Sequence, residues 1–430
     1  MPPPDRSGAR FAGGPPVRID GERLWAALGA LGSIGSYPDP ATGLMGVNRL
    51  ALTDADGAAR RRVMAWMAAA GLAVTVDEIG NIFGRREGSE PALAPVMTGS
   101  HIDSVATAGR FDGCLGVLGA LEVIRAMGDR PIRRPVVVAV WTEEEGVRFG
   151  TDMLGSAVAA GRIDVADAHA LVDRDGTRLV DELVRLGFDG SRPAAIAEPP
   201  AAYVELHIEQ GPVLERAGRP LGVVTGVQAI SWQEVTVHGR AAHAGTTPTE
   251  IRVDAAVAAA ELVVHLRRLV DSGRYGQLRA TVGALRLHPG LTNVVAERAD
   301  LTVDLRNPDD DAMAAAEAEV ADHLRRAAER HAGLRIEART TARTSAVGFD
   351  ADMQNRIEAA IGRLGVPPVR LVSGAGHDAQ EIAAIAPTAM IFVRGQYDGV
   401  SHNPREFSTP EDCVAGVTVL ADVLLELADR

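Results

Sequence analysis

A histidine and two aspartates stand in the first segment whose residue types could do chemistry. Residues 98–113 read TGSHIDSVATAGRFDG, which places His101, Asp103 and Asp112 directly after a predicted strand at residues 96–100. In open α/β sheets, ligand-binding groups gather at the carboxyl ends of the strands. His101 offers a neutral ring nitrogen to a metal ion, and Asp103 could bind the other ring nitrogen. A core histidine with a capping aspartate is the structural alternative.

Three adjacent glutamates end the next predicted strand. The segment WTEEEG places Glu143, Glu144 and Glu145 after the β-branched run at residues 135–142. Carboxylates at the buried end of an apolar strand are costly unless cations neutralise them, and a pair of divalent ions would do so. Successive side chains of an extended segment point to opposite faces, so Glu144 and Glu145 must have different tasks. One could bind metal while the other accepts a proton from water; a solvated acidic loop is the alternative.

Two more segments add histidines. ELHIEQG holds His207 and Gln210, and GVSHNP near the C-terminus holds His402. Four strand ends thus supply imidazoles and carboxylates, which suits a pair of divalent ions sharing one bridging carboxylate. Imidazole ligands favour zinc, manganese, cobalt or nickel over magnesium or calcium.

The middle of the chain carries a separate group of polar residues. In GRAAHAGTTPTEIRVD, His243 stands among small residues that give it little to pack against, so a functional role is favoured over core filling. GLTNVV supplies Asn293 and DLRNP supplies Arg306. An arginine and an asparagine could hold a substrate carboxylate, the arginine in bidentate fashion, although Arg306 taken by itself is typical of a surface residue. Cys114 has no evident base partner and is interpreted as a small helix residue.

The composition excludes several classes of protein. All 44 basic residues other than histidine are arginine, so Schiff-base and pyridoxal-phosphate enzymes, Ser-Lys amidases, P-loop NTPases and centres bridged by a carboxylated lysine are ruled out. A net charge of −13 argues against nucleic acid and anionic membrane surfaces as partners and favours small molecules. No apolar run has the length of a signal peptide or a membrane span, and two cysteines fit a reducing cytoplasm.

The elements that must position these residues alternate between helix and strand. The order predicts an α/β unit whose sheet is flanked by helices, and it is interrupted by a segment of different texture. That segment runs strand, helix, strand, strand, helix, strand, the order of a ferredoxin-like domain. We therefore predict a flexible tail at residues 1–17, a discontinuous catalytic domain at 18–222 and 342–430, and an inserted domain at 223–341.

The motifs together resemble a known family. TGSHIDSV, GRFDGCLGV, EEEGVRFG, ELHIEQGPVLE, GRAAHAGTTP, GLTNVV, GAGHDA and GVSHNP, in this order, resemble the amidase branch of the M20 metallopeptidase-like hydrolases. The resemblance extends from about residue 20 to the end. It implies a zinc-aminopeptidase-like catalytic domain with a mixed sheet, and an inserted α+β lid that also forms a homodimer.

The resemblance also implies a ligand set of two divalent ions per subunit. Asp112 would bridge the two ions. His101 and His207 would complete one site. Glu145 and His402 would complete the other, and Asp103 is expected to orient His101 without binding metal itself.

The same resemblance assigns roles around the metals. Glu144 would be the general base, and His243 would stabilise the oxyanion across the dimer interface. Gln210, Asn293 and Arg306 would bind the ureido group and the carboxylate of the substrate. His377, in the GAGHDA loop, would line the site with them.

The implied activity is hydrolysis of an N-carbamoyl-L-amino acid. Allantoate hydrolysis and β-ureidopropionase activity remain open, because each substrate presents a ureido group and a carboxylate. A dipeptidase or aminoacylase is disfavoured by His207 and Gln210, and a silent ligand-binding relative by the filled metal and base positions. Thr249 and the Arg394-Gly395 pair depart from the pattern of many members, at positions near the expected pocket.

Overall fold

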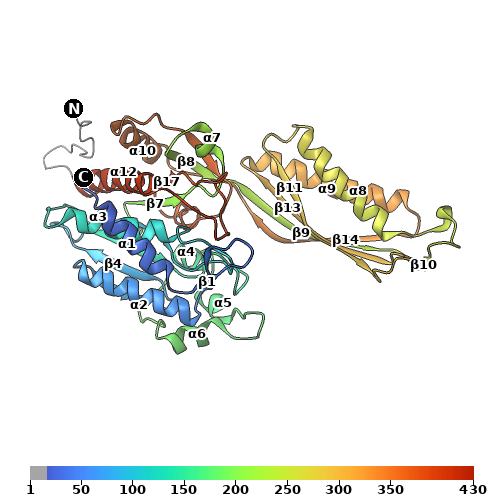
Figure 1. Ribbon diagram of the computed structural model, residues 1–430, viewed down its shortest axis with the longest axis horizontal. Coiled ribbons are helices and arrows are strands. Elements are labelled where there is room, and N and C mark those ends of the chain that lie inside the picture. The colour runs from blue at the N-terminus through green and yellow to red at the C-terminus, as the bar shows by residue number, and fades with distance from the viewer. Residues whose placement is uncertain (1–16) are drawn as a thin grey trace. The chain divides into compact units, whose positions relative to one another are not determined.

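The computed structural model of the chain describes residues 17–430, so the tail predicted for residues 1–17 lies outside the described residues except for Val17. The chain forms two compact units (Figure 1). Unit 1 comprises the described residues up to Gly226 together with Gly348–Arg430, and unit 2 comprises Val227–Val347.

Unit 1 is built on a mixed sheet. Its path runs β15-β8-β17-β7-β5-β6-β4-β3, with β16 paired to β8. The pairs β17–β7, β7–β5 and β5–β6 are parallel, and the flanking pairs β8–β17, β4–β6 and β3–β4 are antiparallel. The strands are β3 (Ala73–Val76), β4 (Ile82–Arg86), β5 (Val96–His101), β6 (Val136–Trp141), β7 (Ala202–Ile208), β8 (Leu221–Val227), β15 (Val347–Gly348), β16 (Arg370–Ser373) and β17 (Thr388–Val393), with a separate hairpin of β1 (Ser36–Pro38) and β2 (Met45–Val47).

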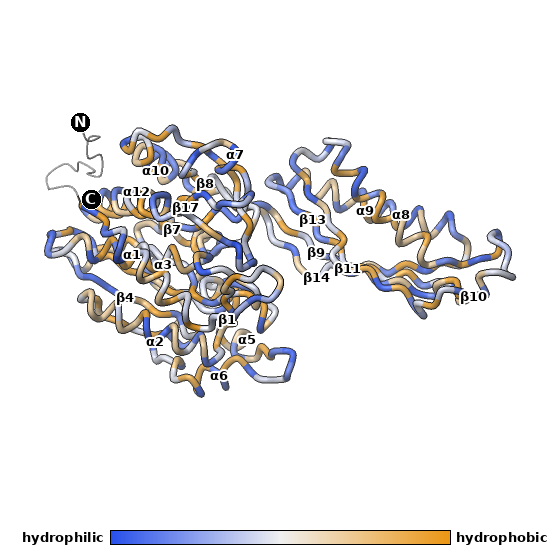
Figure 2. The backbone as a smooth tube through the Cα atoms, in the orientation of Figure 1, coloured by the Kyte–Doolittle hydropathy of each residue, from blue (hydrophilic) through white to orange (hydrophobic). Residues whose placement is uncertain are grey.

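The central strands are apolar because the sheet is covered on both faces. Every residue of β5, β6, β7 and β17 is buried, which explains the apolar runs of β6 and β17, whereas β5 and β7 also carry buried polar residues such as His101 and His207. Figure 2 shows apolar stretches in the interior of unit 1 and polar stretches in its outer loops.

Helices pack against this sheet in groups. Helices α1, α3 and α12 contact one another, and α3 and α12 contact β7; α4 and α11 form a second group in which α11 also contacts β7. The helices of unit 1 are α1 (Gly21–Gly32), α2 (Asp54–Ala69), α3 (Cys114–Met127), α4 (Leu154–Ala159), α5 (Val165–Ala170), α6 (Leu179–Leu186), α7 (Val213–Ala217), α10 (Ala351–Arg363), α11 (Asp378–Ile382) and α12 (Pro410–Ala428).

Unit 2 is a four-stranded antiparallel sheet covered by two helices. The sheet order β11-β13-β9-β14 is the ferredoxin-like order, so the predicted fold class is confirmed in both units. Apolar residues from β9, β13 and both helices form its core. Its elements are β9 (Ala229–His238), β10 (Ala242–His243), the 3-10 turn η1 (Thr249–Ile251), α8 (Ala255–Asp271), β11 (Arg279–His288), β12 (Val294–Val295), β13 (Arg298–Asn307), α9 (Asp310–Arg330) and β14 (Arg335–Thr344).

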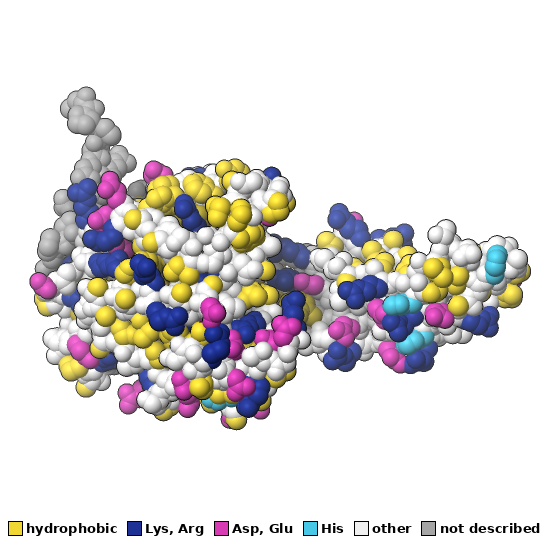
Figure 3. All heavy atoms as spheres, turned by 60° about the horizontal axis from the view of Figure 1, so that its bottom comes forward, with side chains coloured by type: hydrophobic (Ala, Val, Ile, Leu, Met, Phe, Trp, Pro, Cys, Tyr) yellow, Lys and Arg dark blue, Asp and Glu magenta, His cyan; other side chains and the backbone are white. Residues whose placement is uncertain are grey.

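Two local features interrupt the regular elements of unit 1. The polar segment at 164–186 forms two short helices, because a turn closed between Asp173 and Thr177 separates them. The strand that carries His207 ends at Ile208, before Gln210, which has a left-handed backbone with φ of 54°. No helix within residues 17–430 is long and apolar enough to cross a membrane. On the face in Figure 3, arginine and acidic side chains of unit 1 are interspersed, which is unlike a basic nucleic-acid footprint.

Candidate metal centre

Four neighbouring strands of unit 1 end at the same edge of the sheet. β5 ends at His101, which pairs in register with Trp141 of β6, and β7 and β17 run parallel beside them. The polar segments after these strands therefore converge, as the sequence predicts for carboxyl ends of parallel strands.

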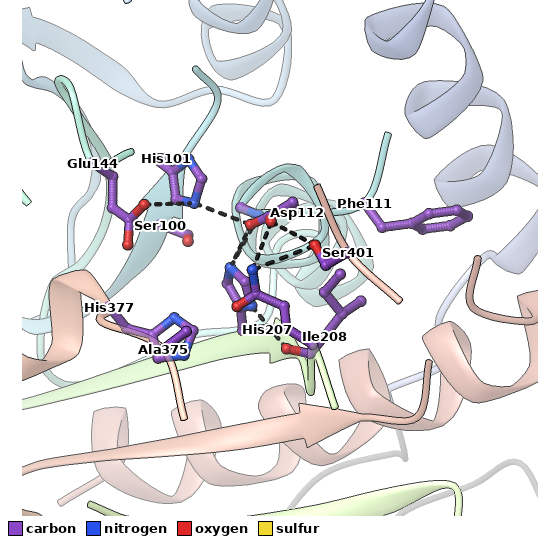
Figure 4. Close-up of polar contacts among 12 residues, drawn as sticks. Ser100, His101, Phe111, Asp112, Glu144, His207, Ile208, Ala375, His377 and Ser401 are labelled. Atoms are coloured by element: carbon purple, nitrogen blue, oxygen red, sulfur yellow. Dashed lines mark hydrogen bonds and ion pairs between the residues drawn. The ribbon is translucent and has the colours of Figure 1, made fainter. Parts of the chain in front are cut away.

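Three histidines approach the carboxylate of Asp112, and Figure 4 shows two of them, His101 and His207. Oδ1 of Asp112 lies 3.4 Å from Nε2 of His101 and 3.2 Å from Nε2 of His207. Its Oδ2 lies 3.4 Å from Nε2 of His402, which in turn lies 3.2 Å from Oε2 of Glu145. Each oxygen of Asp112 thus faces its own group of donors, one with two imidazoles and one with an imidazole and a carboxylate.

Glu144 and Glu145 point to different partners, as alternation along an extended segment requires. Oε2 of Glu144 lies 3.4 Å from Nε2 of His101, whereas Glu145 reaches His402. Asp103 orients both glutamates, because its two carboxylate oxygens accept hydrogen bonds from their backbone N–H groups at 3.4 and 3.3 Å. The nearest partner of Nδ1 of His101 is the backbone oxygen of Asp103 at 3.1 Å, and the carboxylate is 3.7 Å away, so the main chain rather than the side chain orients this ring.

Burial makes the charges of this centre strongly interdependent. Burial raises the pKa of Glu144 well above its ordinary value, opposed by His101. For Asp112, burial opposes ionisation, but the imidazoles of His101, His207 and His402 beside the carboxylate outweigh it and hold its pKa well below the ordinary range. The pKa of His402 rises to about 10 through its contacts with Asp112 and Glu145. The site therefore holds carboxylates and imidazoles in an arrangement that positive charge stabilises.

Divalent cations fit this donor set. Nε2 of His101 is buried without a hydrogen-bond partner among the described residues, although three carboxylates surround its ring. A buried ring nitrogen of this kind is costly unless a ligand takes it. Carboxylate and imidazole donors, with ligand atoms within 4.8 Å of one another, are the set that zinc and similar ions prefer.

Two backbone features hold the donors in place. Three of the residues at this centre, none of them glycine, have a left-handed backbone, which such residues rarely adopt: Glu143, Gln210 and His402, with φ of 55°, 54° and 54°. Gly113 has φ of 61°, and a Cβ there would lie 2.5 Å from atoms of the His101 ring. Only glycine therefore allows α3 to begin directly against this imidazole.

Gln210 and His377 lie beside the same centre. Nε2 of Gln210 donates a hydrogen bond of 2.7 Å to Oδ2 of Asp112. The His377 ring lies 4.5 Å from that of His207, and its Nε2 contacts the hydroxyl of Ser373 at 2.9 Å. Burial lowers the pKa of His377 well below the ordinary value, so this imidazole is neutral. Cys114 is buried next to the guanidinium of Arg49 rather than a base.

Two buried carboxylates that the sequence did not predict support the centre. Glu406 accepts hydrogen bonds from the backbone N–H groups of Phe111 and Asp112 at 2.9 and 3.2 Å and from the Ser401 hydroxyl at 2.7 Å. Glu205 accepts from Ser100 at 2.7 Å and lies with His207 and His377 in a third group of donors. Glu406 stands four residues after His402, so its nearness to that motif was the available signal.

The three predicted residues of the inserted segment lie in unit 2. His243 on β10 pairs with Val294, and the backbone oxygen of Asn293 accepts a hydrogen bond from the N–H of Ala244, the residue after His243. The structure therefore brings His243 and Asn293 together. Arg306 lies near the other end of β13, where its guanidinium pairs with Asp304 at 3.1 Å. The structure therefore separates Arg306 from the other two within this unit.

Fold and donor set together define a metal-dependent hydrolase class, and comparison with known proteins gives the family. Residues 97–426 match the model of Peptidase family M20/M25/M40. The chain belongs to this family, whose members depend on divalent metal ions.

Individual relatives match over nearly the full chain. An N-carbamoyl-L-amino acid amidohydrolase of Geobacillus stearothermophilus is 40% identical over 428 residues, covering 95% of this chain and 99% of the relative. A ureidoglycolate hydrolase of Arabidopsis thaliana is 34% identical, covering 96% and 87%. The crystal structure of a hydantoinase/carbamoylase family amidase from Burkholderia multivorans has a TM-score of 0.89 at 42% identity, covering 96% and 99%.

Proposed function

We propose that the protein hydrolyses the carbamoyl C–N bond of an N-carbamoyl-L-amino acid or a closely related ureido acid. The observation that carries this proposal is the Asp112 carboxylate facing two groups of metal donors, in a chain 40% identical to an N-carbamoyl-L-amino acid amidohydrolase. The products would be the free amino acid, carbon dioxide and ammonia.

The residues would hold two divalent ions drawn from zinc, manganese, cobalt or nickel. Asp112 would bridge them. His101 and His207 would complete one site, while Glu145 and His402 would complete the other. When bound, such ions act as Lewis acids and lower the pKa of water.

Glu144 moves the proton. Its carboxylate takes a proton from the attacking water as a C–O bond forms at the ureido carbon and the carbonyl electron pair moves to oxygen. The C–N bond to the amino acid then breaks, and Glu144 returns the proton to the departing nitrogen. The carbamate left behind decomposes to carbon dioxide and ammonia.

Replacing this base separates chemistry from metal binding. Glu144→Gln should lower the rate of ammonia release by about 10³-fold or more, with the metal content of the purified protein unchanged. Glu411→Gln, at an exposed position in the first turn of α12, is the matched control and should keep full activity. Full activity of Glu144→Gln would contradict the assignment.

The dimensions of unit 2 favour a site shared between two chains. Arg306 lies eight positions along β13 from Arg298, which is about 26 Å of extended chain, and the two-stranded pair β10–β12 that carries His243 lies beyond Arg298. A small ureido acid is much shorter than this distance. His243 and Arg306 can therefore serve one substrate only if they come from two copies, so we propose a homodimer formed through unit 2, which acts as lid.

Mixing two inactive variants tests this arrangement. Glu144→Gln lacks the base, and His243→Ala lacks the oxyanion donor, but a mixed dimer would contain one site with both residues. Co-expressed variants should recover about a quarter of the native activity if dimers form at random, with mixed dimers counted by native mass spectrometry. Mixed dimers without activity would contradict a shared site.

Ureidoglycolate is the second candidate substrate, because a relative 34% identical is named for its hydrolysis. Thr249 and the Arg394-Gly395 pair are the positions we expect to tune this choice. Ammonia release from N-carbamoyl α- and β-amino acids, allantoate, ureidoglycolate and a dipeptide, each with the four metals in turn, would identify the substrate. A protein that holds two metal ions per chain but hydrolyses none of these compounds would favour a catalytically silent ligand-binding protein.

A further inference from the structure

A cavity lies in unit 1 beside residues 109–111, the segment that leads to Asp112. It has a volume of about 450 Å³ and lies between α1, the β1–β2 hairpin, residues 109–111, Tyr397 and residues 404–407. Its walls include exposed apolar side chains, among them Leu44 at 46% and Tyr397 at 65% of their full exposure. The cavity is large enough for a small organic molecule.

Arg110 lines this cavity with a positive charge that has no hydrogen-bond acceptor or ion-pair partner among residues 17–430. Its guanidinium lies over the rings of Trp25 and Phe111, 4.7 and 5.1 Å from their centroids. No hydrogen bond or ion pair joins the Arg110 side chain to any residue in the range 17–430, whereas nearby arginines such as Arg23 and Arg394 have carboxylate partners. Half-burying a cation without an acceptor is costly, so the site is suited to an anion.

The acidic side chain in the cavity wall is already occupied. Both oxygens of Glu406 accept hydrogen bonds from Phe111, Asp112 and Ser401, so this carboxylate is not the partner that Arg110 lacks. A second guanidinium, that of the exposed Arg405, also lines the cavity and has no ion pair with a described residue. The charge of the wall therefore favours a carboxylate over an ammonium.

The cavity and the metal centre share one loop. Phe111 points away from the metal donors, on the opposite side of the chain from Asp112 (Figure 4). Glu406 binds the N–H groups of both residues. A molecule that displaces Phe111 would therefore disturb the hydrogen bonds through which Glu406 also holds the backbone of Asp112.

We propose that this cavity binds a small carboxylate with an apolar body, separate from the metal centre, and that its occupancy changes metal affinity at Asp112. The carboxylate pairs with Arg110 and Arg405, and the apolar body contacts the aromatic and aliphatic wall. Binding does not depend on the proposed reaction.

Binding is measured with 3-phenylpropionate and the manganese-loaded protein. Calorimetry gives the affinity, and quenching of Trp25 fluorescence, absent in Trp25→Phe, gives the location. The carboxylate should bind at least tenfold more tightly than 3-phenylpropanamide, and Arg110→Gln should remove this preference. Arg62→Gln is the matched control, because Arg62 also lies over a tryptophan, 5.7 Å from the Trp66 centroid, but outside the cavity.

Each arm has a result that overturns the proposal. Equal affinity for acid and amide in the native protein would eliminate the carboxylate site, and so would binding that leaves the tryptophan fluorescence of the native protein unchanged; neither result requires a variant to fold. The manganese dissociation constant should change at least threefold at saturating 3-phenylpropionate, and an unchanged constant would refute the coupling. Tighter binding of L-phenylalanine than of 3-phenylpropionate would identify the enzyme's own product class as the ligand; weaker binding would identify an unrelated carboxylate.

Discussion

Nε2 of Gln210 donates a hydrogen bond of 2.7 Å to Oδ2 of Asp112, the oxygen that also faces His402. The amide that the resemblance assigns to substrate binding is therefore in contact with the carboxylate proposed to bridge the metals. The left-handed backbone of Gln210 turns its side chain back toward the centre after β7 ends. If the proposed roles of both residues hold, this one side chain would take part in substrate recognition and in orienting the metal ligand.

Removing the Gln210 amide should weaken metal binding as well as substrate binding. Partners that orient metal ligands typically contribute 10–100-fold to metal affinity, so Gln210→Leu should raise the dissociation constant for manganese by about 10-fold. Gln277→Leu, at an exposed position of unit 2, is the control. Calorimetric titration of manganese checks the result; an unchanged constant would show that the hydrogen bond is dispensable.

Gly113→Ala should disrupt the metal centre in addition to the free energy that the substitution costs through backbone strain. The new Cβ would lie 2.5 Å from the His101 ring, and the positive φ adds about 1 kcal/mol. Gly161→Ala is the matched control, because Gly161 has φ of 77° but open space where the new methyl group would lie. Both variants should lose thermal stability, and only Gly113→Ala should lose metal content. Equal metal content in the two would exclude a clash at His101.

Glu406 should respond differently to two substitutions. Glu406→Ala leaves the N–H groups of Phe111 and Asp112 without an acceptor, at a cost of about 3 kcal/mol in unfolding free energy. Glu406→Gln keeps one acceptor oxygen for them, and its amide can donate to the Ser401 hydroxyl. Chemical denaturation should therefore show a large loss for alanine and a small one for glutamine. Similar losses in both would mean that charge, rather than hydrogen bonding, matters at this position.

The candidate site residues that follow strands could be predicted from the sequence, because the hydrophobic pattern identifies the strands and the site residues come directly after them. Apolar runs identify buried strands, and parallel strands place the residues after them at one edge, so His101, Glu145 and His207 could be expected to converge. Glu406 could not be found in this way. Its role depends on a loop that lies 294 residues along the chain from Asp112, and nothing local encodes that approach.

The separation inside unit 2 was also invisible in the sequence. His243, Asn293 and Arg306 all stand in one predicted domain, and the strand order alone decides which of them are neighbours. Antiparallel pairing brings the residues near 243 and 293 to one end of the sheet and leaves Arg306 near the other. Register, rather than residue type, carries this information.

Unit 2 should lose stability in mild acid through a pair of histidines. The rings of His265 and His323 stack with centroids 4.0 Å apart between α8 and α9. Burial, followed by the neighbouring His265, lowers the pKa of His323 to about 4, and burial also lowers the pKa of His265. Below the ordinary value of 6.5, the unfolded chain takes up protons that the native rings refuse, so unfolding free energy falls as the pH drops from 6.5 toward 4.

His323→Gln should reduce this acid sensitivity, because glutamine does not titrate. At pH 7.5 both imidazoles are neutral in the folded and unfolded chain, and the variant should differ from the native protein only by the altered packing. At pH 5 the native protein loses stability that the variant keeps, so the difference in urea midpoint between them should shift in favour of the variant. Urea unfolding followed by tryptophan fluorescence, in which Trp232 reports on unit 2, provides the measurement. The same difference in midpoint at both pH values would show that the stacked pair does not set the acid stability of this unit.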